Sequence, residues 1–240
     1  MQNGLYVALS SQVALERRLN TIADNVANAT TTGFRATGVK FEDLVTSGTA
    51  RNSMSFVSSG TNFLSTANGP VTQTGNPLDF AIRGEAWFGV ETPEGPVMTR
   101  DGRFSMLPDG TLVNVEGHPV LDAGGGQLLL NPEGGPPTVG ADGSIRQNGE
   151  LVGAIGLFEF EPGEDFRRHG GSGIMPNGDP VPIVDQANVG VVQGYLEGSN
   201  VDPVLEITRL IQVQRAFEGV SALIRDSEST VRDAIKTIGS

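Results

Sequence analysis

Residues 5–34 read LYVALSSQVALERRLNTIADNVANATTTGF and hold the pattern that decides the fold. A mostly apolar residue recurs there at alternating steps of three and four, at Leu5, Ala8, Gln12, Leu15, Leu19, Ile22, Val26 and Ala29. This spacing keeps one narrow stripe on the side of an α-helix that faces a second helix. Because no Gly or Pro lies between Leu5 and Thr32, the pattern predicts a continuous helix over that stretch.

The partner for this stripe lies at the other end of the chain. The same spacing returns at Ile207, Leu210, Gln214, Phe217, Ser221, Ile224, Glu228, Val231, Ile235 and Ile238. Asp202 and Pro203 supply an N-cap acceptor and a first helical residue of fixed φ, and Gly239 stands where the helix would end. The sequence therefore predicts two long terminal helices that pair with each other. The alternative is two ordinary core helices of a globular domain.

The negative charge of the chain is concentrated in its middle. The net charge is −12 at pH 7, and residues 51–199 hold 18 of the 28 acidic residues but only seven of the 16 basic ones. This distribution argues against binding to nucleic acid or to anionic membranes, since both need clustered Lys and Arg. The sequence has no cysteine, no apolar run of about 18 residues and no visible Sec-type signal peptide. We expect no membrane insertion, and either a cytosolic protein or one exported without a cleaved signal.

Turn signals divide the middle of the chain into short segments. Asp-Gly and Asn-Gly pairs, which supply the positive φ of tight hairpins, recur at residues 101–102, 109–110, 142–143 and 148–149. Short apolar runs lie between these pairs. The pattern predicts an all-β, hairpin-rich domain of sandwich or barrel type.

These observations predict an α+β protein. Its helical inner domain would comprise residues 1–34 and 200–240, paired like a coiled coil, and its all-β middle domain would comprise residues 77–199. Residues 35–76 show little periodicity and are predicted to form an extended connector.

Small polar side chains gather at the end of the first predicted helix. Asn25 and Asn28 lie three residues apart on one helical face, and a run of threonines leads to Gly33, which can take positive φ and end the helix. Polar side chains placed in this way suit lateral hydrogen bonds to neighbouring helices in a packed assembly.

No set of residues in the sequence predicts catalysis or a bound cofactor. His118 and His169 are the only histidines, 51 residues apart, and with no carboxylate at metal-ligand spacing and no third nitrogen donor they do not predict a zinc site. The serines lack a G-x-S-x-G elbow, and the aspartates beside glycines are explained as turn residues. We therefore expect no enzyme activity, no cofactor and no metal site.

Three motifs resemble those of one family. The segment NVANATTTGFRA, residues 25–36, resembles the N-terminal signature of flagellar rod, hook and hook-cap axial proteins, although Asp24 replaces a usual Asn. Residues 74–82, TGNPLDFAI, and residues 199–201, SNV, resemble two further elements of the same family, in the same order. The opening residues and the short length look most like the proximal-rod members, with the distal-rod members next.

The resemblance implies a structural subunit of the bacterial flagellar basal-body rod, in the periplasmic space, that polymerises through its terminal helices. Its expected partners are other copies of itself, neighbouring rod proteins and the flagellar export apparatus, which would account for the missing signal peptide. Distal-rod and hook subunits remain alternatives. An alternative from another class is a soluble acidic β-domain binding module with a helical dimerisation stalk.

The predicted assembly interface combines the helical stripes with the polar motif residues. It comprises Leu5, Leu15, Leu19, Ile22, Asn25, Val26, Asn28, Thr32, Gly33, Phe34, Asn200, Ile207, Leu210, Phe217, Ile224, Val231 and Ile235.

Overall fold

A computed structural model describes residues 2–41, 43–46, 54–57, 60–164, 166–183 and 188–238. The chain forms two compact units. The helical unit comprises Met1–Ala27, Thr37–Phe63 and Asp202–Ser240, and the β unit comprises Asn28–Ala36 and Leu64–Val201. A helix at each end of the chain and many strands between them confirm the predicted α+β class.

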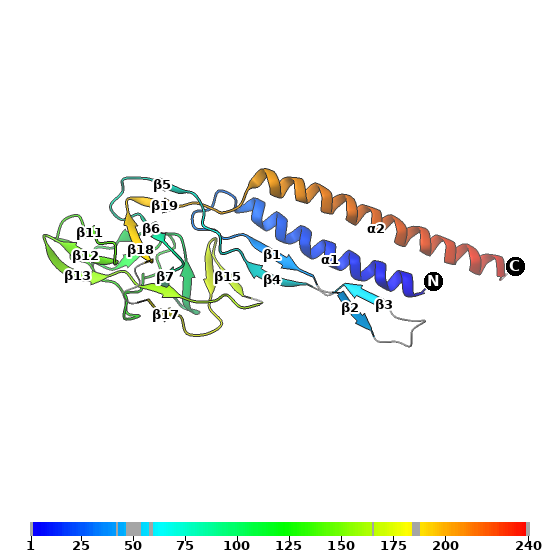
Figure 1. Cartoon of the computed structure of the whole chain (residues 1–240), viewed down its shortest axis with the longest axis horizontal. Helices are drawn as coiled ribbons and strands as arrows, with labels where there is room; N and C mark the ends of the chain where they lie inside the picture. The colour runs from blue at the N-terminus through cyan, green and yellow to red at the C-terminus, as the bar shows by residue number, and fades with distance from the viewer. Residues whose placement is uncertain are drawn as a thin grey trace. The chain divides into compact units, whose positions relative to one another are not determined.

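The helical unit is built on two terminal helices that lie side by side, α1 (Gln2–Ala27) and α2 (Pro203–Ile238) (Figure 1). Two short antiparallel pairs accompany them: β1 (Thr37–Lys40) with β4 (Thr61–Leu64), and β2 (Asp43–Thr46) with β3 (Met54–Val57). These strands lie in the segment that was expected to be an extended connector. Among the described residues, neither helix holds an apolar stretch long enough to cross a membrane.

The start of α2 is confirmed, whereas the end of α1 differs from the prediction. The Asp202 carboxylate accepts hydrogen bonds from the backbone N–H groups of Val204 and Leu205, at 3.0 and 3.1 Å, as an N-cap should. The continuous helix predicted to Thr32 instead ends at Ala27, six residues before Gly33. Asn and Thr propagate a helix poorly, and the backbone after Ala27 finds its hydrogen-bond partners in the β unit.

The stripe of α2 that packs on the helical unit follows steps of four and three. Its buried or half-buried positions are Glu206, Leu210, Val213, Phe217, Val220, Ile224 and Ser227, with Ser221 half-buried beside them. The half-buried Leu210, Phe217, Ser221 and Ile224 belong to the predicted stripe, but Ile207 and Gln214 are exposed. The apolar pattern predicted that Ile207 is buried at the start of α2. In the structure the neighbouring Glu206 is buried instead and forms an ion pair with Arg209.

The β unit is assembled from antiparallel strands. Its largest sheet has the order β15 (Arg167–His169), β16 (Gly173–Met175), β8 (Gly95–Thr99), β7 (Trp87–Thr92), β14 (Leu157–Glu159) and β17 (Val181–Pro182). Smaller sheets join β5 (Val71–Gln73) to β19 (Tyr195–Glu197), β6 (Phe80–Arg83) to β18 (Gly190–Gln193), β9 (Ser105–Met106) to β10 (Leu112–Val113), and β11 (Thr138–Val139) to β12 (Ser144–Gln147) and β13 (Glu150–Ala154).

Two hydrophobic clusters fill this unit. The larger one includes Phe80, Phe88 and Phe104, with the ring of Phe104 in contact with the other two, and the smaller one includes Trp87, Met98 and Phe158. Burial of these aromatic side chains is the main favourable contribution to the stability of the unit.

The turn chemistry of the β unit is confirmed at three of the four pairs. Asn148 and Gly149 have φ of 51° and 85° between β12 and β13, and Gly110 and Gly143 also have positive φ. The prediction for Asp101-Gly102 was wrong, because no hairpin forms there. A Cβ on Gly102 would lie 1.8 Å from the carbonyl oxygen of Phe80, so glycine is needed at this position for close packing.

Candidate assembly site

The helices carry apolar side chains that the chain itself leaves exposed. On α2 the exposed side chains Val204, Ile207 and Ile211 recur at i, i+3 and i+7 and form one row, the α2 row. On α1 the exposed side chains Leu9 and Val13 lie four residues apart. Large apolar side chains aligned at the surface mark sites of contact with other proteins.

The predicted interface residues have different positions in the structure. Ile22, Asn25, Gly33 and Phe34 are buried, and Ile207 is exposed on the α2 row. The half-buried ones are Leu15, Leu19, Val26, Asn28, Thr32, Asn200, Leu210, Phe217 and Ile224. The side chains of Leu5, Val231 and Ile235 lie outside the described residues. Contact of these residues with neighbouring subunits stays a prediction.

Sequence reasoning missed most of the exposed rows. Leu9, Val13, Val204 and Ile211 were not among the predicted interface residues, although the spacing of residues 204, 207 and 211 was a readable signal. The predicted interface used only the stripe that buries one helix against the other. Apolar residues outside that stripe have no partner within the described part of the chain, and these are the residues that indicate a contact with another protein.

Asn25 serves the interior of the helical unit. Its amide nitrogen donates to the carbonyl oxygen of Thr37, and its amide oxygen accepts from the backbone N–H of Thr37, both at 2.9 Å. The side chain is 3% exposed. This pair of hydrogen bonds fixes the end of α1 to the start of β1 and satisfies a buried amide.

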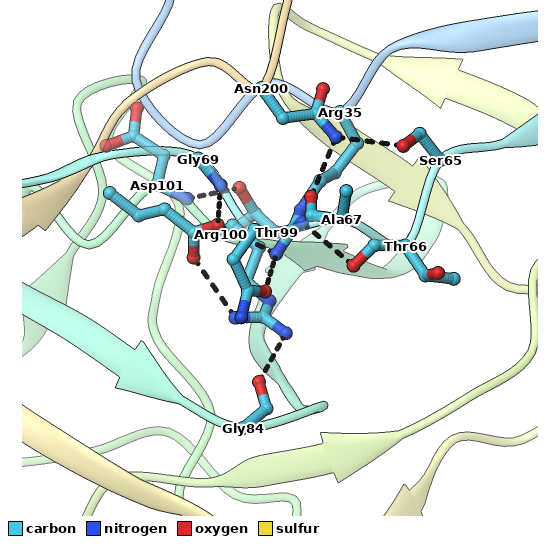
Figure 2. A network of polar contacts seen from close by, with 12 residues as sticks. Arg35, Ser65, Thr66, Ala67, Gly69, Gly84, Thr99, Arg100, Asp101 and Asn200 are labelled. Atoms are coloured by element: carbon cyan, nitrogen blue, oxygen red, sulfur yellow. Dashed lines mark hydrogen bonds and ion pairs between the residues drawn. The ribbon is translucent and has the colours of Figure 1, made fainter.

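The β unit contains a buried centre of three charged side chains, Arg35, Glu197 and Arg100, which we call the Arg–Glu–Arg centre. Glu197 Oε1 lies 2.7 Å from Nη2 of Arg35, and Oε2 lies 3.1 Å from Nη1 of Arg100. All three side chains are at most 2% exposed. Figure 2 shows Arg35 and Arg100 converging there from different segments of the chain.

Neutral groups add further hydrogen bonds to the centre. The backbone N–H of Gly69 donates to Glu197 Oε1 at 2.9 Å. Arg35 donates to the carbonyl oxygen of Thr66 and to the side chain of Asn68, and Arg100 donates to the carbonyl oxygen of Gly84 (Figure 2). The Nε atoms of both arginines stay buried without a hydrogen-bond partner, so these bonds offset only part of the cost of burying the cluster.

Two guanidinium groups share one carboxylate, so the centre carries one excess positive charge. Burial lowers the pKa of Arg100 to about 10 and also lowers the pKa of Arg35, while Glu197 opposes both shifts. The Trp87 ring lies 5.4 Å from the guanidinium carbon of Arg100 and 5.9 Å from that of Arg35. The electron-rich face of the indole adds to the compensation of this charge.

The backbone of both terminal motifs meets at this centre. The N–H of Gly33 donates to the carbonyl oxygen of Glu197 at 2.8 Å, and the N–H of Asn200 donates to that of Phe34 at 3.2 Å. Asn200 Oδ1 accepts from the N–H of Ala36 at 2.7 Å. Gly33 has φ of 70°, and a Cβ there would lie 2.2 Å from the backbone nitrogen of Asp101, so no other residue fits. Residues 33–36 of the first motif and Asn200 of the last one therefore contact each other inside the β unit.

Replacing the carboxylate of the centre should destabilise the β unit strongly. Glu197→Gln removes the carboxylate that is paired with two buried guanidinium groups, so we expect the free energy of unfolding to fall by about 3–5 kcal/mol. Urea unfolding followed by fluorescence of Trp87, the only tryptophan, measures this loss. Glu94→Gln is the matched control: it breaks an exposed pair with Arg167, worth about 0–1 kcal/mol. Equal losses in the two variants would contradict the role of the centre.

Three family models match segments at the two ends and in the middle of the chain. The family model described as "Flagella basal body rod protein" matches residues 5–35. "Flagellar hook protein FlgE/F/G D1 domain" matches residues 81–151, and "Flagellar basal body rod FlgEFG protein C-terminal" matches residues 192–237. The first match covers most of α1 and Gly33 to Arg35, and the third covers Glu197, Asn200 and nearly all of α2.

Individual relatives match over their full lengths. Flagellar basal-body rod protein FlgF of Mesorhizobium japonicum is 63% identical over 240 residues, which cover 100% of this chain and 99% of the relative. FlgF of Rhizobium meliloti is 53% identical with the same coverage. The rod protein FlgG of Bacillus subtilis is 29% identical over an aligned region that covers 98% of this chain and 98% of the relative. The chain therefore belongs to the FlgF family of flagellar basal-body rod proteins, which are structural subunits of the rod.

Proposed function

We propose that the chain occupies the proximal rod and assembles there through its helical unit, in contact with other copies of itself and with neighbouring rod proteins. The observation that carries this proposal is the α2 row, Val204, Ile207 and Ile211, exposed on a helix that already packs a different stripe within the chain. Burial of such a side chain contributes about 1.5–3 kcal/mol. Three of them on one face supply a sizeable part of a subunit contact.

The packing of the two helices supports a coiled-coil-like pair as the assembly element. The steps of four and three along the buried stripe of α2 match the spacing that keeps a seam on a partner helix. Because this stripe is used within the chain, the α2 row is available for a second, different surface on a neighbour. Contacts between unlike surfaces are those that build a helical polymer rather than a closed dimer.

The remaining expectations belong to the same proposal. A protein of this kind acts without catalysis or a cofactor, and it reaches the periplasmic part of the basal body through the flagellar export apparatus. A net charge of −12 fits contacts with protein rather than with nucleic acid or an anionic membrane. The 29% identity to a FlgG protein, against 63% to a FlgF protein, makes the distal rod the second candidate.

Charges on the α2 row should block incorporation into the rod. We expect Ile207→Asp/Ile211→Asp to reduce the amount of this chain in purified hook–basal bodies at least about tenfold, because burying two unpaired carboxylates at a contact is unfavourable. Quantitative mass spectrometry of basal bodies measures the amount. The circular dichroism spectrum should be unchanged, since both side chains are exposed.

The matched control adds the same charge to another face of the same helix. Thr208→Asp/Gln212→Asp changes two exposed residues that are also four apart. This variant should be incorporated at the wild-type level. Wild-type incorporation of Ile207→Asp/Ile211→Asp would show that the α2 row is not a subunit contact.

The copy number in the same preparation distinguishes the two rod positions. A few copies of the wild-type chain per basal body are expected for a short proximal segment. Many tens of copies would instead favour the distal rod or the hook.

A further inference from the structure

The β unit brings together the only two histidines of the chain and one carboxylate. Glu116 and His118 lie in the turn that follows β10, and His169 is the last residue of β15. Nitrogen and oxygen atoms of the three side chains all lie within 4.8 Å of one another, and the two imidazole rings are 5.8 Å apart between centroids. The 51 residues between the two histidines argued against a metal site, but the fold brings the two side chains close together. Glu116 supplies the third donor.

The backbone around the three side chains is held independently of any ligand. Asn114 Oδ1 accepts from the N–H groups of Glu116 and His118, at 3.0 and 2.8 Å, and the N–H of Asn114 donates to the carbonyl oxygen of His118. His169 pairs with Gly173 across the β15–β16 hairpin. Gly170 has φ of 57°, and a Cβ there would lie 2.4 Å from Glu116 Oε1. Because Gly170 has no side chain, the Glu116 carboxylate can approach the backbone next to His169.

The cluster has an unsatisfied ring nitrogen and adjoins a small cavity. His118 Nδ1 is buried without a hydrogen-bond partner, 3.5 Å from Glu116 Oε2. A buried ring nitrogen without a partner is unfavourable, and binding a cation would satisfy its lone pair. Glu116 and His169, but not His118, line an adjacent cavity of about 80 Å³, which is large enough for a water molecule. Arg103 also lines it, but its charge is compensated by Asp101 at 2.6 Å.

We propose that Glu116, His118 and His169 form a binding site for a divalent transition-metal ion, with Zn²⁺ the best match. Imidazole nitrogen and carboxylate oxygen are common zinc ligands, whereas Mg²⁺ and Ca²⁺ need more oxygen atoms than this site offers. Ligand atoms of a tetrahedral zinc ion lie about 3.3–3.5 Å apart, so small side-chain rotations would close the site. Water would occupy the fourth position.

The bound ion would join the turn after β10 to the β15–β16 hairpin. These segments are about 50 residues apart in the sequence, so the ion would act as a cross-link within the β unit. A ligand that binds only the folded state raises its stability. The site is therefore structural, and it does not depend on the position of the chain in the rod.

The site is tested by titrating the full chain, without an affinity tag, with Zn²⁺ in solution. We expect one equivalent to bind by calorimetry, and the ring proton signals of both histidines to shift together in the NMR spectrum. Because the chain has only two histidines, these signals report on this site alone. Zinc should also raise the thermal unfolding midpoint. Mg²⁺ at the same concentration should not bind, shift the histidine signals or raise the midpoint.

Variants assign the ligands. His169→Gln should abolish binding and the thermal shift, and Glu116→Gln should weaken binding at least about tenfold. Glu133→Gln, which removes one exposed carboxylate elsewhere in the β unit, should bind like the wild type. Unshifted histidine signals, wild-type binding by His169→Gln, or equal weakening by Glu133→Gln would each overturn the proposal.

Discussion

The ion pairs of Glu197 with Arg35 and Arg100 are the interaction on which the rest of the β unit depends. They join the segment after α1, the segment before α2 and the middle of the chain at one buried point. Taking three charges out of water is costly, and a hydrophobic cluster of the same volume could be as stable. What the charges add is a requirement for defined partners. A misplaced terminal segment would leave a buried charge unpaired, so the centre favours one register of the two segments.

The sequence pattern placed the motif residues and the apolar residues of the helices in one predicted interface, but in the structure they lie in different surroundings. The hydrogen bonds of Gly33, Phe34 and Asn200 lie within the β unit, and their expected contact with other subunits stays a prediction. Other apolar side chains, among them Leu9 on α1 and the α2 row, are exposed on the helices, in positions outside the helix–helix stripe. The motif residues hold the fold of the subunit, whereas the α2 row is the surface that we propose for subunit contact.

Local signals predicted local structure well. Asp202-Pro203 predicted the start of α2, and Asn148-Gly149 predicted a hairpin, because each depends on the conformation of a few neighbouring residues. Contacts between distant residues could not be read in this way. The pairing of Arg35 with Glu197, the approach of His118 to His169 and the close packing at Gly102 all depend on tertiary structure, as does the end of α1 at Ala27.

Hydrogen exchange of the isolated chain tests most directly whether the two terminal motifs fold as part of the β unit. The N–H groups of Gly33 and Asn200, which donate to Glu197 and Phe34, should be protected to within about 1 kcal/mol of the amides of β7 and β8. Such protection would show that the motifs are already packed before any assembly. Exchange of both amides at the rate of an unstructured chain, with β7 and β8 still protected, would contradict the account.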